Sequence, residues 1–225
     1  MHKFNFPILS IINSKLIVFT DGFGDFVEKL PMYLKFLIVS FLVICFLLPG
    51  IKSIPPLDRD EARFSQASKQ MLEDQNYVVI KFQDELRAKK PIGIYWVQSL
   101  SAYIFGKESI TSYRIPNVIA FITLTLVFSA FVYNIAYRYF DVAFSTAINY
   151  SLLTSILLSI IFGFAIEIKQ AKTDSILLML CTIQQLIFWK IYNYGKESWN
   201  IYKHNDHAWL VRLFWFILAL GILIK

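Results

Sequence analysis

Five apolar runs separated by polar segments constrain this chain more than any other feature of its sequence. A helix needs about 20 apolar residues to cross the hydrocarbon core of a bilayer, and these runs are close to that length. In lipid, only a helix or a closed barrel satisfies the backbone hydrogen bonds of a spanning segment. The sequence therefore predicts an all-α polytopic membrane protein with about five transmembrane helices, over residues 33–49, 115–133, 142–164, 175–191 and 209–224.

The composition supports this class. Hydrophobic residues make up 56% of the chain and charged residues only 17%, and the charges gather between the apolar runs. Soluble domains carry about 25% charged residues. The net charge of +6 fits contact with anionic lipid headgroups. The chain has neither a basic helix nor a basic patch interleaved with aromatics, so we expect the membrane as a partner and no nucleic acid.

The two ends of the chain are less regular. Residues 1–31 form an N-terminal extension whose apolar stretch is interrupted by Pro7, Asn13 and Lys15. An interfacial segment is one reading of it, and a true start at Met32 is another. Because the chain stops at Lys225, directly after the fifth run, we expect residues 32–225 to be the N-terminal part of a longer membrane domain, truncated at its C-terminus.

The long polar section between the first two runs contains two helix candidates. In the first, Phe64, Ala67 and Met71 fall on one face at helical spacing. The second has Pro91 at its first position and Gly106 as its stop. It carries aromatic residues of the kind found at headgroup depth, namely Tyr95, Trp96 and Tyr103. We expect two juxtamembrane amphipathic helices in the first outer loop, the alternative being a soluble loop packed on itself.

Residues 58–63 place three carboxylates and two guanidiniums within six positions, beside the first apolar run. Charge next to a membrane is costly, which favours a functional role. The alternative is a capping box, in which Asp58 caps a helix and Glu61 reaches back to it. That alternative leaves Asp60 and Arg63 unexplained.

Span counting places the main polar residues on one side of the membrane. Asp60 and Asp174 are separated by two predicted spans, and Lys225 lies two spans further on, so all three share a face. The Lys and Arg bias of the short loops puts that face outside, in the periplasm. Paired carboxylates suit general-base catalysis or a divalent metal. Arg63, Lys89 and Lys90 suit a phosphate, the alternative for the two lysines being contact with headgroups.

Four segments together resemble a known family. They are Asp-Glu-Ala-Arg-Phe at 60–64, Lys-Pro-Ile-Gly-Ile-Tyr-Trp at 90–96, Ala-Lys-Thr-Asp at 171–174 and Leu-Ile-Lys at 223–225. They look like the bacterial aminoarabinose-transferase and protein O-mannosyltransferase group, which are integral-membrane glycosyltransferases of the GT-C type (families 39 and 83). One departure is Lys89, where family members often have Glu, and this puts a bound metal in doubt.

The resemblance implies an inverting sugar transfer from a polyprenyl-phosphate donor to a lipid A-type or protein acceptor. It places the protein in the bacterial inner membrane, with its active face in the periplasm. It implies catalytic acids at Asp60 and Asp174. Further residues follow from the same match, with Arg63, Lys90 and Lys225 as phosphate-binding residues and Glu61 and Tyr95 as supporting ones. No cofactor is implied with certainty, and the remainder of the enzyme would be encoded downstream.

Two other functions remain open on the sequence alone. A transporter segment would explain Gln184, Gln185 and Arg212 within apolar runs. An inactive membrane remnant or scaffold would use the acids only as helix caps.

Overall fold

The computed structural model describes residues 48–56, 58–140, 143–161, 166–197 and 208–225, with isolated positions between 30 and 45. The predicted N-terminal extension and the predicted first span at 33–49 therefore lie largely outside the described residues.

The described part of the chain is mostly helical, as the sequence predicts. A small antiparallel hairpin is the exception, with Lys81 opposite Leu86 and Phe82 opposite Glu85. In chain order the elements are α3 (Arg59–Glu73), β1 (Lys81–Phe82), β2 (Glu85–Leu86), α4 (Gly93–Phe105), α5 (Ile110–Tyr139), α6 (Phe144–Ile160), α8 (Asp174–Glu197) and α9 (Ala208–Ile224).

Two of these helices are long and apolar enough to cross a membrane. The qualifying segments are Ile110–Tyr137 in α5 and Asp174–Asn193 in α8. Two further apolar segments, Thr146–Ile160 and Ala208–Ile224, are shorter. All four correspond to predicted runs, whereas the count of five spans stays a prediction.

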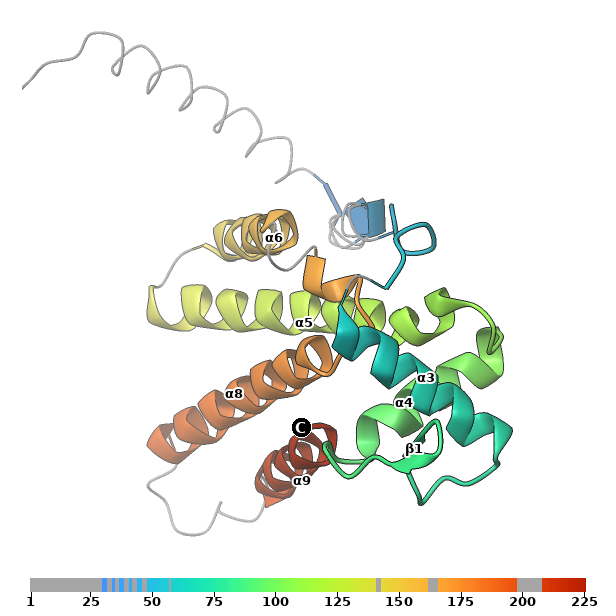
Figure 1. Cartoon of the computed structure of the whole chain (residues 1–225). Helices are drawn as coiled ribbons and strands as arrows, with labels where there is room; N and C mark the ends of the chain where they lie inside the picture. Colours follow the sequence, from blue (N-terminus) through green and yellow to red (C-terminus); the bar gives the residue numbers. More distant parts are fainter. Residues whose placement is uncertain are drawn as a thin grey trace, which may run out of the picture.

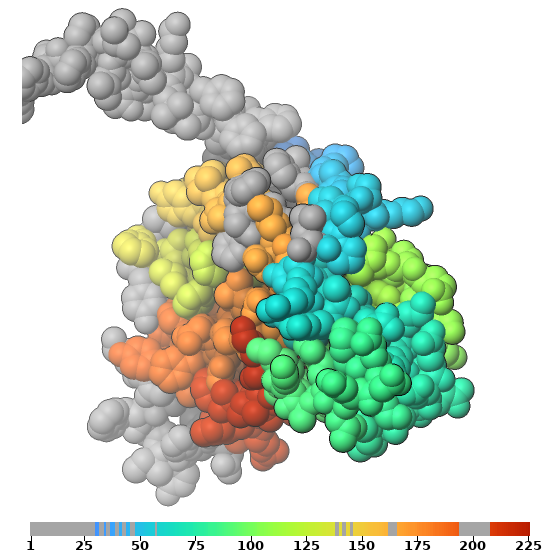
Figure 2. Space-filling model, in the orientation of Figure 1, coloured from blue at the N-terminus to red at the C-terminus, as the bar shows by residue number. Residues whose placement is uncertain are grey.

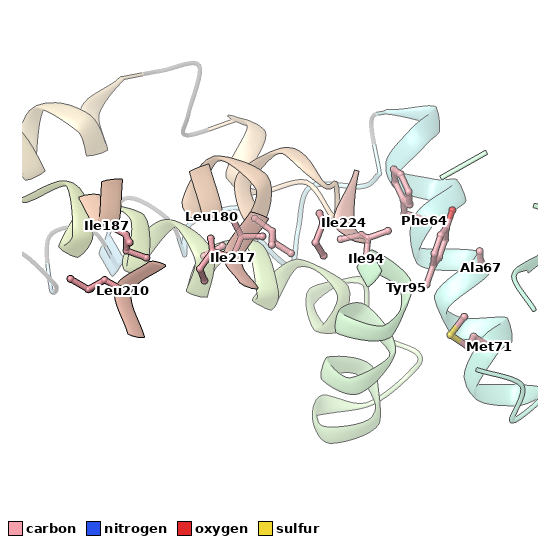
Figure 3. Packing of buried hydrophobic residues seen from close by; sticks show 12 residues of the cluster. Phe64, Ala67, Met71, Ile94, Tyr95, Leu180, Ile187, Leu210, Ile217 and Ile224 are labelled. Atoms are coloured by element: carbon pink, nitrogen blue, oxygen red, sulfur yellow. The ribbon is translucent and has the colours of Figure 1, made fainter. Parts of the chain in front are cut away.

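The helices divide into an apolar bundle and a compact polar end. The helix α5 packs against α6 and α8, and α8 packs against α9. The helices α3 and α4 and the hairpin gather at one end of the bundle, where the C-terminal end of α9 also lies (Figure 1). One buried cluster joins the two parts, because Ile94 of α4 lies beside Ile224 of α9 and Tyr95 lies beside Phe64 of α3 (Figure 3).

The two polar-section helices form as expected but differ in detail. The predicted apolar face of α3 is buried, with Phe64, Ala67 and Met71 in the core. Gly106 ends α4 at a φ of 100°, as predicted. The predicted start of α4 at Pro91 is wrong, because Ile92 is the N-cap and its carbonyl accepts the first helical hydrogen bonds.

The predicted headgroup position of one α4 aromatic is also wrong. The side chain of Tyr95 is fully buried, while those of Trp96 and Tyr103 are exposed. Successive helix positions differ by about 100°, so neighbouring aromatic residues face different surroundings. Tyr95 therefore belongs to the core that joins α3 to α4.

Candidate functional site

A buried ion pair between α3 and α5 underlies the polar end of the molecule. The Arg114 Nε atom lies 2.7 Å from Glu61 Oε1, and its Nη2 atom lies 3.1 Å from Glu61 Oε2. The two side chains are 1% and 0% exposed. This two-pronged geometry is the strong form of an Arg–carboxylate contact, and it fixes both direction and distance.

The same pair also binds two backbone segments. Arg114 Nη1 donates to the carbonyls of Ile51 and Ile54, at 2.7 and 2.8 Å. Glu61 Oε1 accepts from the backbone N–H of Ala171 at 2.9 Å. One pair thus joins α3, the segment that precedes it, the start of α5 and the segment that leads into α8.

The capping-box alternative is confirmed for Asp58 and wrong for Glu61. Asp58 is the N-cap of α3, and its Oδ1 atom accepts from the Asp60 N–H at 2.7 Å. Glu61 does not reach back to the cap, because its carboxylate is held in the interior by Arg114. The favourable charge pairing outweighs the weak local hydrogen bond that a capping Glu would make.

Asp58 also links α3 to the segment before α8. Its Oδ2 atom lies 2.6 Å from Lys172 Nζ. This hydrogen bond, together with the one from the Asp60 N–H, lowers the pKa of Asp58 below its ordinary value. Lys172 is only 13% exposed and also lies 3.6 Å from Glu167. Burial acts against its charge, but the carboxylates around it, including Asp174, raise its pKa overall.

The two predicted catalytic acids are both exposed at this end of the molecule. Asp60 lies in the first turn of α3 with its side chain 58% exposed, 3.6 Å from Arg63 Nη1. Asp174 is the first residue of α8, and its Oδ1 atom lies 2.5 Å from Lys225 Nζ. Each acid is therefore paired with one of the cations that the sequence assigns to phosphate binding.

A close backbone contact positions Lys225. A side chain carbon added at Gly93 would lie 2.6 Å from the Leu223 carbonyl oxygen, so only glycine allows α4 to approach α9 this closely. The end of α9 meets the chain around the start of α4 on the surface shown in Figure 2. The segment 90–96 thus places the segment 223–225.

Tyr95, predicted as a supporting residue, makes a hydrogen bond with Arg87. Its hydroxyl oxygen accepts from Arg87 Nε at 2.9 Å, and burial raises the pKa of this phenol while Arg87 partly opposes that rise. Its ring lies 5.6 Å from the ring of Phe64. The negative charge of Asp60 adds a smaller contribution to the raised pKa of this hydroxyl.

Lys90, also predicted to bind phosphate, is not paired with either predicted catalytic acid within the described ranges. It precedes α4, is half-buried, and makes no ion pair with any residue in the described part of the chain. Among those residues, no group of three or more His, Cys, Asp or Glu side chains gathers as a metal site would require.

Three residues of this region were missed by reasoning from the sequence: Arg114, Lys172 and Arg87. A signal existed for Arg114, since an Arg directly before an apolar run is costly without a partner. Lys172 lies inside one of the four resembling segments. Nothing in the local sequence marks Arg87, because its neighbours in space come from α3, the hairpin and α4.

Part of the chain is similar in sequence to known arabinosyl transferases. The chain is 34% identical over 73 residues to an undecaprenyl phosphate-alpha-4-amino-4-deoxy-L-arabinose arabinosyl transferase of Yersinia pestis (strain Pestoides F), covering 32% of this chain and 13% of that protein. It is 26% identical over 105 residues to the enzyme of the same name from Shewanella sediminis (strain HAW-EB3), covering 46% of this chain and 18% of that protein.

These matches are partial, since the aligned part spans less than a fifth of the length of each relative. No family model matches the chain, and no solved structure matches it. The similarity and the apolar helices together support a relationship to membrane glycosyltransferases that use a polyprenyl-phosphate sugar donor.

Proposed function

We propose that this chain is part of a membrane glycosyltransferase that transfers a sugar from a polyprenyl-phosphate donor with inversion at the anomeric carbon. One observation carries the proposal. The exposed acids Asp60 on α3 and Asp174 on α8 each lie beside a cation. The buried Glu61–Arg114 pair connects α3 to α5 and, through Ala171, to the segment that leads into α8. The names of the two similar enzymes supply the donor class.

The chemistry assigns a task to each group. An acceptor hydroxyl or phosphate oxygen attacks the anomeric carbon while the carbon–oxygen bond to the donor phosphate breaks. Asp60, as general base, takes any proton that the acceptor loses. The bonding electrons leave with the phosphate, which departs as polyprenyl monophosphate and is stabilised by Arg63, Lys90 and Lys225. Asp174 orients Lys225 through their 2.5 Å contact and is the second acid of the site.

The acceptor and the membrane face complete the proposal. We place the acids at the periplasmic face of a bacterial inner membrane, and the acceptor is a lipid A-type phosphate or a protein hydroxyl. The pairing of Lys225 with Asp174 supports a common face for these residues, because the two are 51 positions apart in the chain.

A transfer assay in membranes tests the proposal. The chain would be expressed with and without the reading frame that follows it, and supplied with radiolabelled polyprenyl-phosphate sugars. We expect Asp60→Asn to lower turnover about 10²- to 10⁴-fold, the range for loss of a general acid or base. Asp174→Asn should also lower turnover, because Lys225 loses the carboxylate that orients it. Asp84→Asn, an exposed acid in the hairpin turn, is the matched control and should retain turnover.

The assay also separates the enzyme from the remnant or scaffold. Asp58, not Asp60, caps α3, so Asp60→Asn should leave folding intact in either case. Stable membrane insertion without turnover in both expression formats would reject the enzymatic proposal for this chain.

A further inference from the structure

Arg87 has a guanidinium that three aromatic side chains hold in place. It follows β2, and its Nε atom donates to the Tyr95 hydroxyl at 2.9 Å. Its guanidinium carbon lies 5.6 Å from the centre of the Phe64 ring and 5.9 Å from that of Phe82. These contacts fix a long side chain that would otherwise be mobile, and so reduce the entropy lost when it binds a ligand.

The charge of Arg87 is not matched by a carboxylate. Within the described ranges, no Asp or Glu oxygen lies in ion-pair distance of it, although its side chain is half-buried. A partly desolvated cation without a counter-ion is costly, and contacts with aromatic faces offset only part of that cost. Lys89 and Lys90 follow Arg87 in the chain, and Arg63, which pairs with Asp60, adjoins Phe64 on α3.

We propose that Arg87 binds the phosphate group of the lipid substrate directly. With Nε committed to Tyr95, its two Nη groups have no acceptor among the described residues, and a planar fork of N–H donors matches phosphate oxygens. The Tyr95 hydroxyl holds Nε and so fixes the direction in which the two Nη groups point. This inference rests on the proposed function, and it adds a binding residue to that site.

A binding experiment with two lipids tests the inference without requiring turnover. The full chain in zwitterionic nanodiscs would be titrated with polyprenyl monophosphate and, separately, with the uncharged polyprenol of equal length. We expect the wild type to prefer the monophosphate, and Arg87→Gln to lose about tenfold in affinity for the monophosphate while its affinity for polyprenol is unchanged. Equal polyprenol binding then shows that the variant is folded.

Three further variants sharpen the result. Arg87→Lys keeps the charge but not the fork and should recover only part of the loss, and Tyr95→Phe, which removes the hydroxyl, should weaken monophosphate binding to a smaller extent. Lys81→Gln removes a hairpin cation that faces Asp74, at 3.9 Å, and should have no effect.

A competition experiment with inorganic phosphate distinguishes free phosphate from the lipid headgroup. Competition for monophosphate binding in the wild type, and not in Arg87→Gln, supports recognition of the phosphate group itself.

Two results would overturn the inference, and they differ in what they say of the proposed function. A wild type that prefers monophosphate, with Arg87→Gln preserving the preference, removes Arg87 from the site and leaves the proposed function standing. A wild type that binds both lipids equally removes the phosphate site as a whole.

Discussion

Two ion pairs of similar chemistry, Glu61–Arg114 and Asp174–Lys225, lie in opposite surroundings. The first is at most 1% exposed and makes additional hydrogen bonds to three backbone groups in two segments. The second is 49% and 41% exposed, at the first residue of α8 and the last residue of the chain. Burial makes the first pair a structural link between segments, while exposure leaves the second pair accessible, as its proposed role in substrate binding requires.

The contrast is sharpest between Asp60 and Glu61, which are neighbours in the sequence. They are about 100° apart around α3, so one faces water and the other faces α5. A carboxylate cluster that reads as one feature in the sequence therefore divides into a candidate catalytic acid and a residue that holds the site together.

The largest predicted effect comes from breaking the buried pair. Glu61→Ala leaves the Arg114 charge unpaired in the interior, and we expect it to lower the free energy of unfolding by about 3–5 kcal/mol. Asp60→Ala, one position away and exposed, should change it by less than about 0.5 kcal/mol. Denaturant unfolding of the purified protein in detergent measures both. Equal effects at the two positions would contradict the structural role of the pair.

The second effect concerns the contact that positions Lys225. Gly93→Ala forces its new methyl group against the Leu223 carbonyl, and such overpacking costs about 1–3 kcal/mol. Gly221→Ala is the control, because its methyl group would lie 3.8 Å from Leu177. Linking cysteines at 174 and 225 with a short bismaleimide reports the position of the α9 end. Unchanged linking yield in Gly93→Ala would show that this contact does not place Lys225.

A smaller effect is expected at Asp58, which combines a cap with an ion pair. Its pKa in the folded protein lies below the ordinary 3.8, so its stabilising contribution is present above that pH and is lost as the pH falls through the folded pKa. Asp58→Asn keeps the cap and should remove this part of the acid sensitivity. Asp58→Ala should also destabilise α3 at neutral pH. Thermal unfolding from pH 7 to pH 3 compares the three proteins.

A small effect on folding is also expected at the exposed pair. Lys225→Gln should change the free energy of unfolding by less than about 1 kcal/mol, since exposed pairs contribute little. The same variant should lower transfer activity, because Lys225 is a proposed phosphate-binding residue. A loss of stability as large as that of Glu61→Ala would remove the distinction between the two pairs.

Much of the helical framework could be predicted because apolar length and periodicity act locally. The runs around α5, α6, α8 and α9, the buried face of α3 and the stop at Gly106 all follow from such patterns. The start of α4 and the orientation of Tyr95 could not, since both depend on which helices pack against α4. The roles of the candidate catalytic acids stay predictions, although the structure brings Asp174 to Lys225 and Asp60 to Arg63.

The sequence by itself determined that this chain is helical, apolar and rich in charge at a few separated segments, because hydrophobic patterning and residue type are local properties. Only the tertiary structure decided which charge serves which purpose. Glu61 links the helices because an arginine 53 positions away is buried beside it, whereas its neighbour Asp60 stays exposed because the helix turns it toward water. Those outcomes depend on distances between helices, which no segment specifies alone.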